Sequence, residues 1–317
     1  MSVQYSVLFV PRPCGFKQRL GWLLAFSWVL APFAVHVARG ESLDSITVRA
    51  QRETLRKEVD QFFTSAILKA PFDESMLRWG QPVCPMVIGM IQPAGEFVLR
   101  RLSEVARESS VPLAKENCKH PNLFIVVAKE PEKFLRLWWH RSPLMYDTSH
   151  GIEPVRRFIE KSRPIRVWYN VGASIDSNEI SGALSGSVDA GLGTVDYPVV
   201  RKPSSGGWGR LVYFVTRNIG SAIVVIDPTQ VSQLNIGQLA DYVAMLSFAE
   251  INQDADLGDT STILNLFKAS EVTAPCEMSR WDKALLKSMY QTNHASRMQM
   301  SAMETRAIKI LEAQPIR

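Results

Sequence analysis

The first forty residues constrain this chain most strongly, because they predict the compartment in which it folds. Three basic residues precede an uncharged run over residues 20–38, and the run leads into Ala38-Arg39-Gly40. A basic start, an apolar run and small residues at a cleavage point are the three parts of a secretory signal peptide. We therefore expect residues 1–40 to be a signal peptide that is cleaved after Gly40, and the mature chain to be exported to the periplasm or the extracellular space.

An uncleaved anchor in the inner membrane is the alternative interpretation of the same run. Residues 20–38 approach the roughly 20 apolar residues that a helix needs to cross a bilayer. Pro32 within the run and the small residues after it favour cleavage. The longest later apolar stretches, such as residues 123–128 and 221–226, have the length of strands. We therefore expect no transmembrane segment after cleavage of the signal.

Loss of the leader changes the charge balance. The whole chain has 36 Lys and Arg residues against 31 Asp and Glu residues, and four of the basic residues but none of the acidic ones precede Glu41. The mature 277 residues thus carry a formal net charge of +1, in a length that suits one large or two small domains. Without a strong positive field or a basic stripe interleaved with aromatic residues, we expect no nucleic-acid partner.

The cysteines fit an oxidising compartment. Cys84 and Cys118 bracket one predicted helix, and neither has a CxxC neighbour or a histidine at zinc-ligand spacing. A structural disulfide between them is therefore favoured over metal or redox chemistry. Cys14 would leave with the signal, which predicts that Cys276 is unpaired. It would then be a buried small apolar residue, which we favour, or a reactive thiol.

The first part of the mature chain, residues 41–171, alternates between helices and strands. Apolar residues at helical spacing predict three helices, over residues 53–70, 93–108 and 131–140. Short apolar runs predict three buried extended segments, over residues 83–89, 122–128 and 165–170. We infer a mixed α/β layer to which the bridge between Cys84 and Cys118 ties one helix.

Residues 172–209 are rich in Gly and Ser and have too few periodic apolar positions to bury much surface. Long loops of this kind are uncommon inside compact domains and are either functional or mobile. The segment is therefore an exposed connector or a contact surface. Part of it could instead pair as a β-hairpin, because Val195, Tyr197 and Val199 alternate with other residues.

Residues 210–317 predict a β-hairpin followed by helices. Apolar runs over residues 210–216 and 221–227 are separated by Arg217-Asn218-Ile219-Gly220, a connection that suits an antiparallel hairpin. Helices are expected over residues 236–251, 260–268, 279–290, where Ser279 would be the N-cap, and 296–312. The fold class is thus α+β, with a mixed sheet and helices in the first half. All parts could form one continuous domain over residues 41–317.

Several segments carry a resemblance to a known family. The chain contains PVCPMVIG, KENCKHPNLFIVV and IRVWYN in its first half, and IGQLADYVAML, TSTILNLF and WDKALLKSMY in its second. In these segments, and in the predicted hairpin, it resembles a family of uncharacterised exported proteins and predicted lipoproteins of proteobacteria. The resemblance covers most of the mature chain and implies membership and export, but it implies no activity.

The order of strand and helix around residues 227–251 is similar to that of zinc peptidases. In those enzymes a helix carries H-E-x-x-H, in which two histidines bind zinc and the glutamate activates water. This chain has Gln238-Leu239-Ala240-Asp241-Tyr242 at the comparable place, so both histidines are missing. The four histidines of the mature chain form no local pair. We therefore expect no metal and no cofactor.

A hydrolase, or a degenerate metal-free relative of zinc peptidases, is nevertheless the alternative function. Its site would lie near the strand over residues 221–227 and the helix over residues 236–251, with Asp241 and Glu250 as weak candidate acids. These two residues are nine positions apart on the predicted helix. They would point to nearly opposite faces and do not obviously cooperate.

Two other site patterns fail on inspection. Residues 182–186 do not match the G-x-S-x-G turn that exposes a nucleophilic serine. Asn252, Asp254 and Asp256 alternate like calcium ligands, but Leu257 and Ile263 stand where an EF-hand needs glycine and glutamate. Helix capping and turn formation explain this acidic segment better.

The weak candidates for ligand binding are Trp139, Trp208 and Arg210. Exposed indoles could stack on a sugar or a peptide, although Trp138 and Trp139 cannot both face the same way on one helix. One of these two should therefore lie in the core. Together these features predict a disulfide-bearing protein of the cell envelope that binds an envelope protein, a peptide or a glycan without catalysis.

Overall fold

A computed structural model describes residues 41–68, 75–115, 117–141, 153–175, 184–189, 194–199, 215–268, 275–293 and 298–313. The predicted signal peptide or anchor and the candidates Trp208 and Arg210 lie outside these residues. Among the helices described, none is long and apolar enough to cross a membrane.

One mixed sheet contains strands from both halves of the chain. Its five strands are β1 (Arg78–Trp79), β2 (Pro85–Ile88), β3 (Leu123–Val127), β4 (Ile165–Ile175) and β7 (Val215–Ile226). β4 pairs antiparallel with β7 along its whole length, and β1 and β3 pair in parallel with successive parts of the other edge of β7. β2 pairs in parallel with β3. The α+β class is thus confirmed, with β7 at the centre of the sheet.

The predicted hairpin with its turn at residues 217–220 is wrong. β7 runs as one strand through these residues, and Asn218 pairs with Arg78 of β1 and with Gly172 of β4. The Asn and Gly residues favoured a turn locally, but strands on both edges satisfy the backbone of β7 and override that preference. The antiparallel partner of β7 is β4, which contains an irregularity between Asn170 and Val171.

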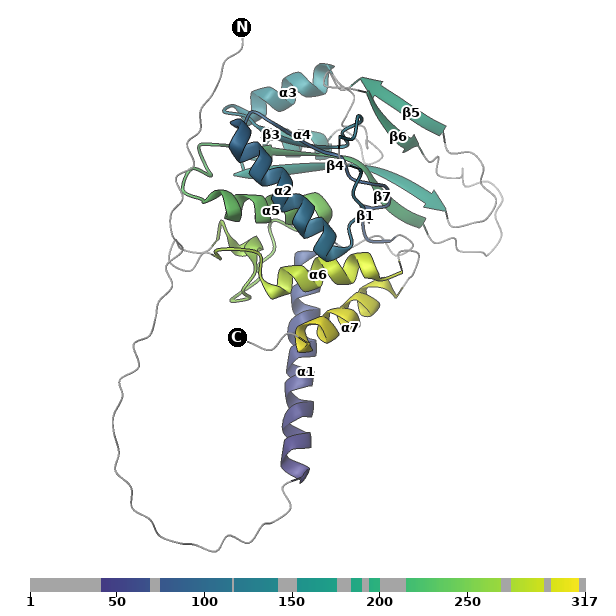
Figure 1. The fold of residues 1–317 in the computed structure, drawn as a ribbon, viewed down its shortest axis with the longest axis vertical. Coiled ribbons are helices and arrows are strands. Elements are labelled where there is room, and N and C mark those ends of the chain that lie inside the picture. Colours follow the sequence, from purple (N-terminus) through teal and green to yellow (C-terminus); the bar gives the residue numbers. More distant parts are fainter. Residues whose placement is uncertain are drawn as a thin grey trace, which may run out of the picture.

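Helices cover both faces of the sheet (Figure 1). α2 (Gln92–Ser109) and α5 (Ile236–Phe248) pack on one face against side chains such as Leu123 and Ile125. α3 (Pro131–Arg141) and α4 (Glu153–Glu160) pack on the other face against Phe124 and Val126. Successive strand residues point to opposite faces. The four buried residues of β3, Leu123 to Val126, therefore contribute alternately to the hydrophobic cores on the two faces of the sheet. The arrangement is a three-layer α/β/α sandwich.

Three further helices lie beyond α2 and α5. They are α1 (Glu41–Ala66), α6 (Arg280–Gln291) and α7 (Gln299–Glu312). From Arg49 onward, where burial is described, the buried residues of α1 lie in its C-terminal part and are Val59, Phe62, Phe63 and Ala66. The N-terminal part leaves the body of the protein (Figure 1). α1 thus begins well before the predicted start at residue 53.

Sequence periodicity located most helices within a few residues. α2, α3, α5, α6 and α7 are all close to their predicted bounds, and the Ser279 side chain accepts hydrogen bonds from Trp281 N and Asp282 N as the predicted N-cap of α6. The helix predicted over residues 260–268 is wrong, since only a 3-10 turn, η2 (Ile263–Asn265), forms there. Thr262 and Asn265 bond the local backbone with their side chains, which competes with helix formation. β1 and α4 have no counterpart among the elements predicted from the sequence.

The Gly- and Ser-rich segment contains more strand than a loop would. β4 continues to Ile175, and β5 (Leu184–Asp189) pairs antiparallel with β6 (Thr194–Val199). In that pairing Val195 lies opposite Val188 and Tyr197 lies opposite Gly186. The hairpin alternative from the sequence is therefore confirmed, and an unstructured loop over all of residues 172–209 is not.

The disulfide between Cys84 and Cys118 is confirmed, with 6.0 Å between the two Cα atoms. It joins the start of β2 to the segment before β3. Asn122 supports the same corner, because its side chain accepts from Cys84 N at 2.7 Å and donates to Pro82 O at 3.0 Å. Cys276 is also disulfide-bonded, so the prediction that it is unpaired is wrong. That prediction counted the cysteines after removal of residues 1–40.

Three aromatic side chains cap the C-terminus of α5. The Tyr169 hydroxyl bonds Leu246 O and Ala249 O, Trp79 Nε1 donates to Ser247 O, and the Tyr290 hydroxyl donates to Phe248 O. The last carbonyls of a helix have no partner within it, so these bonds satisfy groups that would otherwise be buried and unpaired. Burial raises the pKa of Tyr169 and of Tyr290, which keeps both hydroxyls protonated as donors. The end of α5 is therefore tied to β1, β4 and α6.

Candidate functional site

Asp241, the first candidate acid, lies in the middle of α5 and points toward α2. It is completely buried. Arg101 of α2 forms a bidentate contact with its carboxylate, in which Nε donates to Oδ1 at 2.5 Å and Nη2 donates to Oδ2 at 3.1 Å. This contact with the carboxylate raises the pKa of Arg101. Such a two-point contact fixes both the distance and the angle between α2 and α5.

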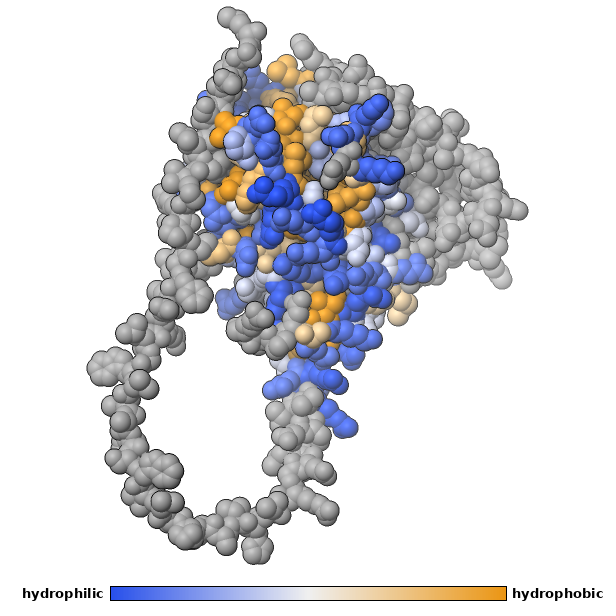
Figure 2. Space-filling view, in the orientation of Figure 1, coloured by the Kyte–Doolittle hydropathy of each residue, from blue (hydrophilic) through white to orange (hydrophobic). Residues whose placement is uncertain are grey.

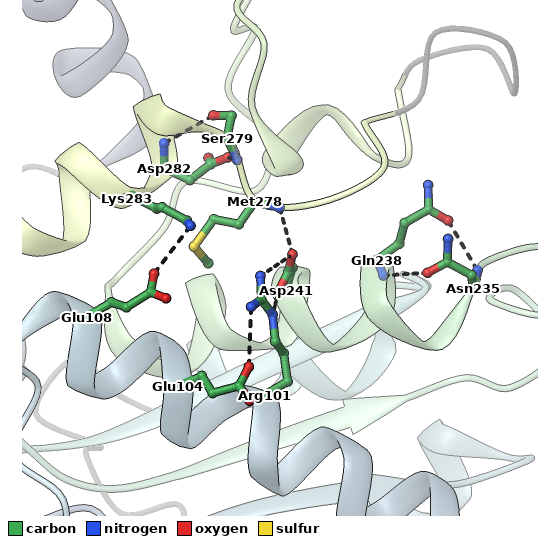
Figure 3. Close-up of polar contacts among 10 residues, drawn as sticks. All are labelled: Arg101, Glu104, Glu108, Asn235, Gln238, Asp241, Met278, Ser279, Asp282 and Lys283. Carbon is green, nitrogen blue, oxygen red and sulfur yellow. Dashed lines mark hydrogen bonds and ion pairs between the residues drawn. The ribbon is translucent and has the colours of Figure 1, made fainter. Parts of the chain in front are cut away.

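A third donor completes the surroundings of Asp241. The backbone N–H of Met278, in the segment before α6, donates to Asp241 Oδ2 at 2.6 Å. Figure 3 shows the carboxylate between Arg101 on one side and Met278 on the other. At the rim, Arg101 also lies 3.4 Å from Glu104, and Lys283 of α6 lies 3.3 Å from Glu108 of α2. One carboxylate therefore joins α2, α5 and the approach to α6.

A second buried carboxylate, Asp282, holds the start of α6. Its Oδ2 accepts from Ser279 N at 2.8 Å and from Ile263 N at 2.9 Å, and the Thr262 hydroxyl donates to its Oδ1. Burial is the main influence on this group and raises its pKa. Asp282 thus links η2 to α6 in the same way that Asp241 links α5 to the segment before α6.

Replacing Asp282 with alanine is expected to destabilise the protein by about 3 kcal/mol, because three buried donors lose their acceptor. The loss should depend on pH. Since the pKa of Asp282 is higher in the folded than in the unfolded state, its contribution is complete in acid and declines as pH rises through the folded-state value. Urea unfolding of both proteins at acidic and at neutral pH measures the difference.

The matched control for this measurement is Ser279→Ala, which removes the helix cap and leaves the carboxylate. It should cost about 1 kcal/mol at neutral pH. A gap between the wild type and Asp282→Ala that widens toward neutral pH would contradict the direction of the shift.

The N-terminus of α5 holds the same segment from another side. Asn235 and Gln238 form a capping box in which each side chain bonds the backbone of the other. Gln238 also donates to Pro275 O at 2.8 Å. Residues 275–278 are therefore anchored to α5 at both ends, by Gln238 and by Asp241.

Glu250, the second candidate acid, lies elsewhere. It follows α5, pairs with Arg217 of β7 at 3.2 Å, and its backbone carbonyl accepts from Leu68 N. Asp241 and Glu250 share none of these partners. The structure therefore does not bring the two candidate acids together.

The tryptophans of α3 divide as expected. Trp138 is 9% exposed and packs edge-on against Phe124 and Phe134, whereas Trp139 is partly buried against the same core. Of the weak ligand-binding candidates, only Trp139 lies among the residues that the structure describes.

The acidic segment after α5 forms turns, as favoured from the sequence. The Asn252 side chain accepts from Asp254 N, and the Asp256 side chain accepts from Gly258 N. Asp254 forms ion pairs with Lys161 and Arg163. Across the described residues, no group of three or more His, Cys, Asp or Glu side chains is placed to hold a metal ion.

Arg101 is the residue that sequence reasoning missed. It lies three positions after Val98 and four before Val105, which are both buried, so it borders the apolar side of α2. A cation at that border can extend its charged group to solvent, so the position alone does not reveal the partner, which is 140 residues away. No protein-family model, curated protein or solved structure matches this chain.

Proposed function

We propose that this protein is an exported, non-catalytic binding or interaction module of the cell envelope. The observation that supports this function most is the state of Asp241. A catalytic carboxylate has to reach a substrate, a water or a metal. Asp241 is closed off from solvent, and Arg101 and Met278 N occupy both of its oxygens. Its side chain is used to fix three elements of the fold.

The contact surface of the module is the segment over residues 172–209. β4 and β7 stay paired as far as Ile175 and Val215, beyond the residues of β7 that pair with β1 and β3. Strand ends that extend past a sheet offer backbone groups to an extended peptide, and side chains along them give specificity. The partner we propose is therefore a protein or peptide of the envelope.

Replacing residues 176–214 with Asn-Gly tests this assignment. Ile175 and Val215 are direct partners in the ladder, so a two-residue turn can close it without moving the sheet. The trimmed protein should keep its unfolding midpoint. When intact cells are treated with a cross-linker, it should lose the cross-links to envelope proteins that the whole protein forms. The same cross-links in both proteins would overturn residues 172–209 as the contact surface.

The alternative is a hydrolase, or a degenerate relative of zinc peptidases. One observation favours it: β7 leads into α5, which packs against the sheet, so the order of strand and helix is that of the peptidase motif. Metal analysis and peptide hydrolysis by the purified protein and by Asp241→Asn separate the two functions. Stoichiometric metal, or hydrolysis that Asp241→Asn abolishes, would favour the alternative.

A further inference from the structure

Cations gather in two grooves on either side of α7. The groove between α1 and α7 has a volume of about 640 Å³ and is lined by Arg49, Arg52, Arg56, Lys57 and Lys309. The groove between α6 and α7 has a volume of about 510 Å³, shares Lys309 and adds Lys287 and Arg306. We call these seven residues the basic face. Only two acids, Glu53 and Glu312, line the same grooves.

Most cations of the basic face have no ion pair within the part of the chain that the structure describes. Arg52 lies 3.0 Å from Glu312, and Lys57 lies 3.6 Å from Glu53. The other five make no ion pair with any described residue, although Arg56 lies within electrostatic range of Glu304. The two grooves therefore keep a formal net charge of +5.

The positive charge of the protein is concentrated in these two grooves and is not spread over the whole surface. The chain after Gly40 has a net charge of +1 and the residues lining the two grooves have +5, so the remainder of the chain after Gly40 carries a formal net charge of −4. A field of one sign on one side of a molecule attracts and orients a surface of the opposite sign. The grooves also have apolar floors, which include Ile308 and Ile310.

The location of α1 relates this face to a membrane. Arg49, Arg52 and Arg56 follow one side of the helix at spacings of three and four residues. The described part of α1 is hydrophilic where it leaves the body (Figure 2). α1 begins at Glu41, directly after the leader whose apolar run is predicted to enter a membrane. In the alternative of an uncleaved anchor, α1 and its cations directly follow the membrane-inserted run; after cleavage, the charge of the basic face alone attracts the protein to an anionic surface.

We propose that the basic face docks on the anionic phospholipid headgroups of a bilayer. Basic residues next to a membrane each raise the affinity for anionic lipid about fivefold. Phosphate groups would lie along the α1 stripe, and the aliphatic stems and groove floors would contact the interface. This proposal goes beyond the interaction module, because it holds whether or not residues 172–209 bind a partner.

Vesicle co-sedimentation of the full chain tests the proposal. One set of vesicles is phosphatidylcholine alone, and the other contains phosphatidylglycerol as the minority lipid. Because residues 20–38 could enter any bilayer, the neutral vesicles measure their contribution and the difference reports the headgroup charge. We expect tighter binding to the anionic vesicles, and this difference should shrink as salt is added.

The variant Arg49→Gln with Arg56→Gln should weaken the anionic part of the binding about thirtyfold, the factor for two cations. The matched control is Lys119→Gln with Arg157→Gln, which removes the same charge from two exposed sites away from the grooves. It should bind almost as the wild type does. Equal binding to both kinds of vesicle, or equal losses in the two variants, would overturn the proposal.

Discussion

Replacing Arg101 with alanine is expected to lower the free energy of unfolding by about 3–5 kcal/mol, which is the cost of leaving a buried charge without its partner. The side chain of Asp241 is 1% exposed, so the carboxylate would stay in a largely buried place after its partner is removed. Urea unfolding followed by circular dichroism measures the change as a shift of the midpoint at an unchanged slope.

The matched control is Arg107→Ala, on the same helix. Arg107 is exposed and forms no ion pair among the described residues, so its removal should change stability by less than about 0.5 kcal/mol. Equal effects of the two substitutions would mean that the contact with Asp241 contributes nothing specific.

The double variant Cys84→Ala with Cys118→Ala is expected to lose about 4 kcal/mol of stability. The bond closes a loop with a sequence separation of 34 that contains α2, and without it the unfolded chain gains conformational freedom. Because the unfolded state also expands, the dependence on urea should steepen. Equilibrium unfolding without reductant measures both effects.

Substitution is preferable to reduction in that experiment. Cys276 is disulfide-bonded as well, so a reductant would break more than the bond of interest. The variant Cys276→Ala is the control, because it leaves the loop around α2 closed. An unchanged unfolding midpoint in the double variant would show that the disulfide adds no stability beyond that of the hydrogen bonds of Asn122.

Local patterns predicted local structure well in this chain. The apolar spacing of α2 and the Ser279 cap of α6 each lie within one helix, so the sequence contains the whole signal. The continuity of β7 through residues 217–220 was not predicted, because the pairing of Asn218 depends on Arg78 and Gly172, which lie far away along the chain. For the same reason the partner of Asp241 could not be found. Its helix was located correctly, but Arg101 reaches it only through the packing of α2 on α5.

The central claim is that Asp241 serves the fold and not a reaction. Its most direct test is a double-mutant cycle with Arg101→Met and Asp241→Leu, measured by unfolding. Each single substitution should cost about 3–5 kcal/mol, whereas the double variant should cost less than either because no charge is left unpaired. Additive losses, or single variants that keep full stability, would contradict the claim.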